Sequence, residues 1–205
     1  MEQKQAIGIL GGTFDPVHYG HLLAAECARR AFGLERVILT PAAQPPHKEG
    51  LSFADKLHRL KMVKSAAADN KHFEVSELEI HREGFSYTVD TVNSLKLLYP
   101  HSPFFFIMGA DALLLIKKWK NYQEITSLCN FIVVTRPGFN INKDYKSSID
   151  LPVTFWSKVK QLEIPAVDIS SSMIRQRIAS GKPIKYLLPD AVESYIYSNN
   201  LYAKE

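Results

Sequence analysis

Short apolar runs alternate with amphipathic segments along the chain, and this alternation predicts strands and helices in turn. Apolar runs predict buried strands at residues 6–10, 36–40, 103–108 and 131–135, with a further strand at 158–164. Apolar positions at helical spacing predict helices at residues 19–32, 54–68, 88–99, 122–128, 170–180 and 189–198. Strands that alternate with helices are typical of parallel sheets built from right-handed βαβ units.

Two further segments complete the predicted fold. Residues 73–80 alternate apolar side chains with Glu74, Glu77 and Glu79, which predicts a strand with one solvated face near a sheet edge. Residues 139–150 are polar and irregular and predict a loop. We therefore expect a Rossmann-like, doubly wound α/β fold, with a mainly parallel sheet and helices on both faces. A single domain spanning residues 1–205 is expected, with a small helical portion from about residue 170.

Composition narrows the class of protein. The 205 residues are 46% hydrophobic and 22% charged with a formal charge of +4, which is ordinary for a soluble domain that binds anionic ligands. There is no basic stripe with interleaved aromatics, so a nucleic-acid partner is not expected. The most apolar stretch, 104–116, is too short to span a bilayer, and no secretory signal is found. Cys27 and Cys129 lie far apart and predict two reduced core thiols in a cytoplasmic protein.

The candidate chemistry begins where the first predicted strand ends. Gly11 and Gly12 let the backbone approach a phosphate, and the following helix N-terminus favours anions. The spacing is neither GxGxxG nor a P-loop. His18 and His21 are three residues apart around the first helical turn, so both imidazoles can face one ligand, and Gly20 leaves that approach clear. The alternatives are two unrelated histidines at a helix start, or a zinc site, for which a third ligand is not evident.

A second anion-binding candidate lies near the C-terminal end. Ser170, Ser171 and Ser172 stand at the start of a predicted helix, where hydroxyls cap the helix or bind an anion. Arg175 follows Ser171 by one helical turn, so its planar guanidinium can reach a phosphate at the helix N-terminus. The alternative for Arg175 is a solvated surface charge, which the serine cluster makes less attractive.

These segments carry a resemblance to a known superfamily. Gly12–His21, GTFDPVHYGH, resembles the GxFxPxHxGH motif of the nucleotidyltransferases, and Ile169–Arg175, ISSSMIR, resembles their ISSTxIR motif with Ser172 in place of threonine. The resemblance covers nearly the whole chain and implies nucleotidyl transfer from ATP. The ATP-binding residues that it implies are Gly11, Gly12, Thr13, Phe14, His18, His21, Gly109, Asp111, Arg136, Ser170, Ser171 and Arg175.

Four other segments bear on the acceptor: Pro45–Lys48, Gly84–Thr91, Gly109–Asp111 and the Lys117–Lys120 run around Trp119. Three of them have a plain alternative: an exposed loop lysine for Lys48, helix capping for Ser86 and Thr88, and core packing for Trp119. Together the segments resemble the bacterial nicotinate mononucleotide adenylyltransferase family. One departure is that Lys120 follows Trp119, where family members often have tyrosine.

By that resemblance, the adenylyl group of ATP passes to nicotinate mononucleotide, giving deamido-NAD and pyrophosphate. Trp119 would stack on the pyridine ring, and Thr88 with a backbone N–H near Lys120 would hold the nicotinate carboxylate. The implied acceptor-binding residues are Lys48, Ser86, Tyr87, Thr88, Trp119 and Lys120, and the implied catalytic residues are His18, His21, Lys48 and Arg175.

Mg²⁺ is the expected cofactor, held mainly by the ATP phosphates and by no protein ligand. Three alternatives stay open: transfer to nicotinamide mononucleotide, transfer to phosphopantetheine, and a nucleotide-binding regulator without turnover. The oligomeric state also stays open, with a homo-oligomer among the expectations.

Overall fold

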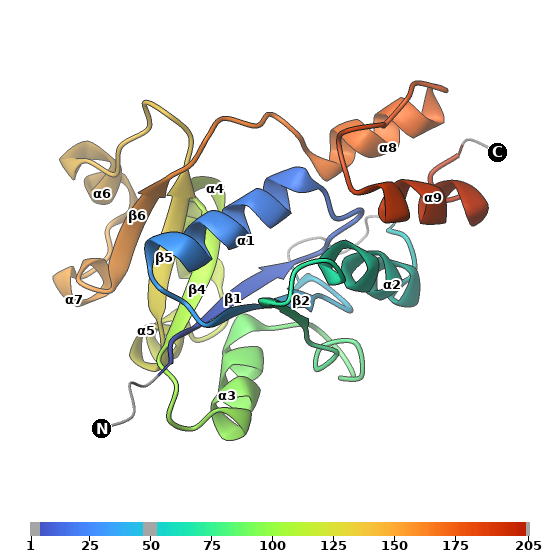
Figure 1. Cartoon of the computed structure of the whole chain (residues 1–205). Coiled ribbons are helices and arrows are strands. Elements are labelled where there is room, and N and C mark those ends of the chain that lie inside the picture. The colour runs from blue at the N-terminus through green and yellow to red at the C-terminus, as the bar shows by residue number, and fades with distance from the viewer. Residues whose placement is uncertain (1–4, 47–52, 204–205) are drawn as a thin grey trace. The chain divides into compact units, whose positions relative to one another are not determined.

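The computed structural model describes residues 5–46 and 53–203 (Figure 1). Within these residues six strands form one sheet in the order β3-β2-β1-β4-β5-β6. This is the 3-2-1-4-5-6 order of a doubly wound Rossmann sheet, so the predicted fold class is confirmed. The strands are β1 (Ile7–Gly12), β2 (Arg36–Pro41), β3 (Phe73–Val75), β4 (Phe104–Gly109), β5 (Asn130–Thr135) and β6 (Val159–Glu163).

The pairing of the strands places a switch point beside β1. β4 runs parallel to β1, with Leu10 opposite Ile107, and β5 runs parallel to β4. β6 then pairs with β5, again in parallel. Strands from the first half of the chain extend the sheet to one side of β1, and those from the second half extend it to the other. Ligands of such sheets bind outside the carboxyl ends of the strands at this reversal.

The helices follow the strands in the expected alternation. Every predicted helix and strand is present. Their bounds are displaced by at most two residues, except for the strand predicted at 73–80, which is shorter. The helices are α1 (Tyr19–Ala31), α2 (Lys56–Ala67), α3 (Thr88–Leu98), α4 (Ala110–Leu114), α5 (Tyr122–Leu128), α6 (Lys143–Ile149), α7 (Val153–Trp156), α8 (Ser171–Ala179) and α9 (Asp190–Ser198).

The described residues divide into two compact units. The first unit contains the residues up to Gly11, Ala24–Val37 and Tyr87–Ala166. The second unit contains Gly12–Leu23, Ile38–Ser86 and the residues from Val167 onward. The expectation of a single domain remains a prediction.

Helical segments cover both faces of β4 in the first unit. Phe105 meets the ring of Phe32, just after α1, at 6.2 Å between centroids. Phe104 meets Tyr99, just after α3, at 6.5 Å, and Phe106 meets Trp119 at 5.5 Å. Because successive strand residues point to opposite faces, these contacts place the segments after α1 and α3 on different sides of β4.

The core of the second unit is formed by α2, α8 and α9. Figure 1 shows α8 and α9 next to one another, and α2 packs against α9. Nδ1 of His58 on α2 and the Tyr195 hydroxyl on α9 are hydrogen-bonded at 2.9 Å. Ile174 on α8, together with Val192 and Ile196 on α9, is fully buried. The C-terminal helices are therefore tied by an apolar core as well as by this hydrogen bond.

The strand predicted at residues 73–80 is shorter than its alternating pattern suggests. β3 ends at Val75, where the Leu78 backbone N–H donates to the Ser76 hydroxyl and turns the chain. Glu79 and Ile80 are both buried, so the pattern does not mark one solvated face. The predicted position at a sheet edge is confirmed.

The prediction of a loop at residues 139–150 is wrong over most of its length, because this segment contains α6. Asn142 caps this helix by accepting a hydrogen bond from the Tyr145 backbone N–H at 2.9 Å. The Tyr145 hydroxyl donates to the carbonyl of Ala110 at 2.9 Å, and Ile149 is buried. A polar segment becomes helical here because it has a cap and two contacts that hold it in place.

The two cysteines differ in burial. Both are free thiols, but Cys129 is buried and Cys27 only half-buried, so the prediction of two core thiols holds for Cys129 alone. Burial raises the pKa of the Cys129 thiol to about 12. In the described part of the chain, no helix is long and apolar enough to cross a membrane.

Candidate functional site

The end of β1 and the loop that follows it have a shape that requires glycine at position 12. The Phe14 ring is buried, at 1% exposure, with a positive φ of 49°. A Cβ atom on Gly12 would lie 3.2 Å from that ring, closer than an ordinary contact. The Gly12 carbonyl accepts a hydrogen bond from the Ala42 N–H at 2.9 Å. Because the Phe14 side chain is buried, only the backbone of this residue is available for the predicted contact with ATP.

His18 and His21 lie face to face at the N-terminus of α1. Their ring centroids are 3.8 Å apart, and the ring planes differ by 31°. Nδ1 of His21 accepts the His18 backbone N–H at 3.3 Å. A neutral His21 therefore carries its proton on Nε2, which makes Nε2–H a donor for a ligand. The predicted pairing of the two imidazoles on one side is present.

His18 is buried in a way that keeps its ring neutral. It is 6% exposed, and burial lowers its pKa to about 4. Its Nδ1 has no hydrogen-bond partner among the described residues and faces the position that a Cβ atom on Gly20 would occupy. A Cβ atom at Gly20 would sit 3.0 Å from both Nδ1 and Cε1. Glycine is thus required at position 20 to seat the imidazole, as well as to leave the approach open.

The second predicted motif lies against this loop inside the second unit. Ser170 caps α8 by accepting the Met173 backbone N–H at 3.2 Å. The Ser171 hydroxyl donates to the Pro16 carbonyl at 2.9 Å. Nη1 of Arg175 donates to the carbonyl of Asp15 at 2.7 Å. The Ser171 hydroxyl and Arg175 hold the two segments together, and the Ser170 hydroxyl caps α8. A phosphate here would therefore meet Arg175 and backbone N–H groups.

Three polar residues that were not predicted from the sequence hold the histidine loop in place. Asp15 is 2% exposed, and its Oδ1 accepts hydrogen bonds from the Tyr202 hydroxyl at 2.7 Å and the Ala54 N–H at 3.2 Å. Arg59 is equally buried and donates to four backbone carbonyls, those of Thr13, Ala42, Ala43 and Ala54. A carboxylate inside the first motif was a signal for Asp15, whereas nothing in the sequence pointed to Arg59 or Tyr202.

Ser86 shapes the loop after β2. Its Oγ accepts the backbone N–H groups of Ala43 at 3.0 Å and Gln44 at 3.3 Å. Both residues line a cavity of about 660 Å³ in the second unit, which also includes Lys56 and Arg59 in its walls. The observed bonds of Ser86 hold a wall of this cavity. Lys48, predicted to bind phosphates, lies outside the described residues.

The predicted acceptor residues of the first unit gather around the start of α3. Tyr87 stands at the N-cap position and provides no side-chain cap, and Thr88 is the first helical residue. Nζ of Lys120 lies 4.5 Å from the centroid of the Tyr87 ring and 3.2 Å from an Asp90 carboxylate oxygen. Trp119 is half-buried and packs edge-on against Phe106. Lys120 thus contacts the Tyr87–Asp90 segment, while contact of these residues and Trp119 with an acceptor remains a prediction.

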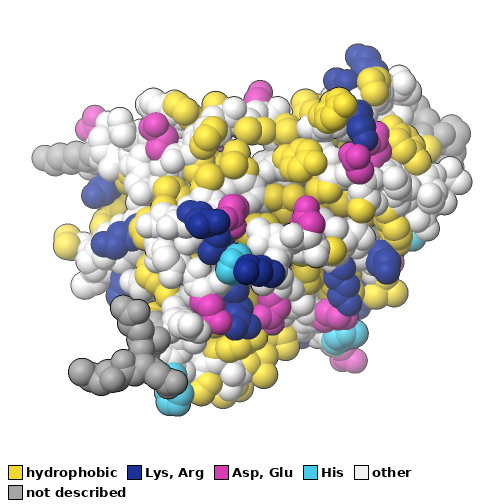
Figure 2. Space-filling view, in the orientation of Figure 1, with side chains coloured by type: hydrophobic (Ala, Val, Ile, Leu, Met, Phe, Trp, Pro, Cys, Tyr) yellow, Lys and Arg dark blue, Asp and Glu magenta, His cyan; other side chains and the backbone are white. Residues whose placement is uncertain are grey.

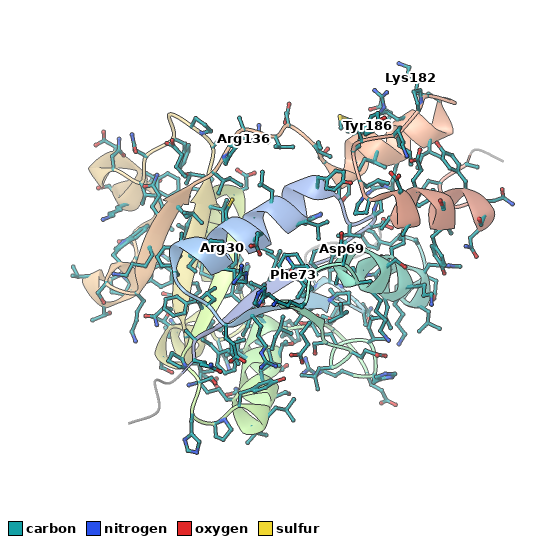
Figure 3. The ribbon with its side chains drawn as sticks, in the orientation of Figure 1. Arg30, Asp69, Phe73, Arg136, Lys182 and Tyr186 are labelled. Carbon is teal, nitrogen blue, oxygen red and sulfur yellow. The ribbon has the colours of Figure 1, made fainter. Side chains whose placement is uncertain are left out.

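Three further predicted ATP contacts follow β4 and β5 in the first unit. Gly109 ends β4 opposite Val134 of β5, so both strands end at the same edge. A Cβ atom at Gly109 would meet nothing within 4 Å. Asp111 and Arg136 are both exposed, and Figure 3 shows Arg136 in the segment after β5. The strands bring these residues to one edge, while their contact with ATP remains a prediction.

Charges of both signs surround these elements. On the face drawn in Figure 2, lysine and arginine side chains are interspersed with acidic ones, so the net charge of +4 is not concentrated there. Among the described residues, no group of three or more His, Cys, Asp or Glu side chains could hold a metal ion.

Comparison with known proteins identifies the family. The cytidylyltransferase-like family model matches residues 9–177. A relative from Moorella thermoacetica, named probable nicotinate-nucleotide adenylyltransferase, is 50% identical over 197 residues, covering 96% of this chain and 91% of the relative. The chain belongs to the nicotinate-nucleotide adenylyltransferase family. The family's enzyme from Bacillus subtilis is 42% identical over 196 residues, covering 96% of this chain and 97% of that enzyme.

A solved structure shares the fold. The nicotinic acid mononucleotide adenylyltransferase of Plasmodium falciparum, complexed with NaAD, superposes with a TM-score of 0.78. It is 22% identical, and the match covers 97% of each chain. At this identity the likeness establishes the fold alone.

Proposed function

We propose that this chain transfers the adenylyl group of ATP to nicotinate mononucleotide, releasing pyrophosphate. The observation that carries the proposal is the stacked pair of His18 and His21 at the start of α1, with Arg175 donating to the same loop. These three side chains offer phosphate oxygens two imidazoles and one fixed positive charge. Phosphoryl-type transfer needs mainly such positioning and charge stabilisation.

The chemistry requires no covalent enzyme intermediate. An oxygen of the acceptor's 5′-phosphate attacks the α-phosphorus of ATP, and the bond from that phosphorus to the β-phosphate oxygen breaks. The electron pair leaves with pyrophosphate. The nucleophile is already an anion, so no general base is needed. His18, His21 and Arg175 stabilise the charge on the transferring and leaving groups.

His18 is neutral when no ligand is bound, and the stacked geometry explains why both imidazoles are not charged together. Two unit charges 3.8 Å apart repel by about 4 kcal/mol at an effective dielectric constant of about 20. In the free protein Arg175 therefore provides the fixed cation. His21 donates through Nε2–H, because its Nδ1 is occupied by the His18 backbone N–H.

The acceptor's pyridine ring is proposed to stack on Trp119, which is half-buried and held edge-on by Phe106. Its carboxylate is proposed to meet the uncapped N-terminus of α3 at Thr88, where the helix dipole favours an anion. Lys120 adds positive charge beside Tyr87. A carboxylate gains from both features and a neutral carboxamide does not, which supports nicotinate over nicotinamide.

Mg²⁺ is proposed to enter with ATP rather than to occupy a protein site. The described residues provide no cluster of ligands for it, and Mg²⁺ commonly keeps waters while binding substrate phosphates. When bound to the triphosphate, it would neutralise charge on the leaving pyrophosphate. Ser86 is proposed to position the loop after β2 rather than to touch the acceptor, because its Oγ accepts from two loop amides.

The test compares acceptors in one assay. Pyrophosphate release is measured with ATP and Mg²⁺ and, in turn, nicotinate mononucleotide, nicotinamide mononucleotide and phosphopantetheine. We expect nicotinate mononucleotide to give the highest kcat/KM. In a Trp119→Ala variant, the KM for this acceptor should rise by about tenfold or more, and the KM for ATP should stay unchanged. ATP binding without pyrophosphate release would point to a regulator, and preference for another acceptor would refute the assignment.

A further inference from the structure

The buried carboxylate of Asp15 joins three segments that are far apart in the sequence. Its Oδ1 accepts hydrogen bonds from the Tyr202 hydroxyl and from the Ala54 backbone N–H. Its Oδ2 lies 3.5 Å from Nη1 of Arg175. All of these residues belong to the second unit. A contact that begins beyond the last helix, at Tyr202, thus ends at an arginine of the proposed phosphate site.

Arg175 is held along one edge by the loop that contains Asp15. Nη1 donates to the Asp15 carbonyl at 2.7 Å and faces the Asp15 carboxylate. Nη2 donates to the Ser172 hydroxyl at 3.4 Å. The Arg175 side chain is 33% exposed, so its remaining N–H groups are accessible to an anion. A guanidinium fixed on one edge presents the other edge in a single orientation.

The position of Asp15 depends on few donors. Oδ1 has the two described above, and Oδ2 has no hydrogen-bond partner among the described residues. A buried carboxylate normally collects several donors, and bonds to a charged acceptor are the strong ones. The Tyr202 hydroxyl, at 2.7 Å, makes the shorter of the two bonds to Oδ1. Removing it would leave the carboxylate with one backbone donor and the attraction of Arg175 and of the nearby Arg59 charge.

We propose that Tyr202 is a positioning residue for ATP: its hydroxyl orients the Asp15 carboxylate, which in turn orients Arg175 toward the triphosphate. The proposal rests on the proposed function only in naming ATP as the anion. Burial, followed by the nearby charge of Asp15, raises the pKa of the Tyr202 hydroxyl. The hydroxyl therefore stays protonated and remains a donor throughout the pH range of an assay.

A double-mutant cycle tests whether Tyr202 acts through Arg175. Tyr202→Phe removes one oxygen and keeps the ring. We expect it to lower kcat/KM for ATP by about tenfold in the otherwise unchanged chain. In an Arg175→Ala background, the same change should lower it by less than about twofold. A merely structural hydroxyl would lower kcat/KM by the same factor in both backgrounds, and that additive result would overturn the proposal.

Tyr195→Phe is the matched control, because it also removes one hydrogen-bonded hydroxyl from the C-terminal region, the one bonded to His58. Its effects should be small and additive with Arg175→Ala. Thermal unfolding of each variant checks folding. If Tyr202→Phe does not fold, Asp15→Asn replaces it in the cycle, since the amide keeps the size of the side chain but removes the charge facing Arg175. Equal effects of Asp15→Asn in both backgrounds would again refute coupling.

The cycle also includes a binding measurement that does not need turnover. In a titration with a non-hydrolysable ATP analogue, Tyr202→Phe should raise the dissociation constant by about tenfold. In the Arg175→Ala background, the same substitution should leave the dissociation constant nearly unchanged. If the unchanged chain binds the analogue but releases no pyrophosphate with any acceptor, the proposed function fails while the positioning proposal is still tested. An unchanged dissociation constant in Tyr202→Phe would refute the positioning role.

Discussion

The seating of His18 against Gly20 leads to a prediction about a single methyl group. A Cβ atom at Gly20 would lie 3.0 Å from Cε1 and Nδ1 of His18, whereas ordinary contacts begin at 3.4 Å. The imidazole of a Gly20→Ala variant must therefore move by about 0.4 Å, which is the difference between these two distances. Because the His18 ring is stacked on His21, we expect this movement to change the stack.

The expected cost follows from how strongly catalysis depends on position. A misplacement of about 1 Å costs about 10²-fold in rate, so 0.4 Å corresponds to about 1 kcal/mol, or about sixfold. Complete loss of one transition-state donor would cost about 10²- to 10³-fold, which is the upper bound. Stability should not fall, because Gly20 lies within α1, outside the positive-φ region, and alanine in a helix is favoured by about 0.5–1 kcal/mol.

The assay measures kcat for pyrophosphate release together with the thermal unfolding midpoint. Gly8→Ala is the control, since its Cβ would lie 2.9 Å from Leu34 Cδ1 in the core of the first unit. That variant should lose about 1–3 kcal/mol of stability through overpacking and keep its turnover per folded molecule. Gly20→Ala should show the reverse pattern. A Gly20→Ala protein with turnover within about twofold of normal would refute the argument that glycine seats the imidazole.

Two further predictions concern the buried ionisable side chains of His18 and Arg59. His18 has a folded pKa of about 4 against 6.5 when exposed, so below pH 6.5 the unfolded chain binds a proton that the folded chain does not. The free energy of unfolding, measured in urea, should therefore fall by about 3 kcal/mol between pH 7 and pH 4, and a His18→Gln variant should not show this decrease. Identical pH dependence in both proteins would contradict this prediction. Arg59→Lys cannot satisfy the four carbonyls that Arg59 reaches and should reduce the unfolding free energy by about 2–4 kcal/mol, and a change below about 0.5 kcal/mol would be inconsistent with it.

The outline of the fold could be predicted because parallel strands are buried on both faces and appear as uninterrupted apolar runs. Those runs located β1, β2, β4 and β5 within two residues. The pattern failed where a distant partner decides the conformation. α6 depends on a cap at Asn142 and on a hydroxyl that reaches Ala110, 35 residues away in the sequence.

The same division applies to the candidate site. The pairing of His18 and His21 follows from their spacing in one helical turn, and the capping role of Ser170 follows from its place before α8. Such local relations are set by backbone geometry, which the sequence encodes directly. Contacts between segments are set by packing, and a side chain such as Tyr202 carries no local signal of its partner.

The sequence therefore determined the strand–helix order, the two motifs at the strand and helix ends, and the family to which they belong. The folded structure decided which of these polar groups are buried. Burial keeps His18 neutral, and the Asp15 carboxylate contacts Tyr202 and Arg175. The hydroxyls of Ser86 and Ser171 form hydrogen bonds that join separate segments. The reason is physical: burial and long-range hydrogen bonding depend on all segments that pack around a group, whereas helix and strand formation depend mostly on neighbours along the chain.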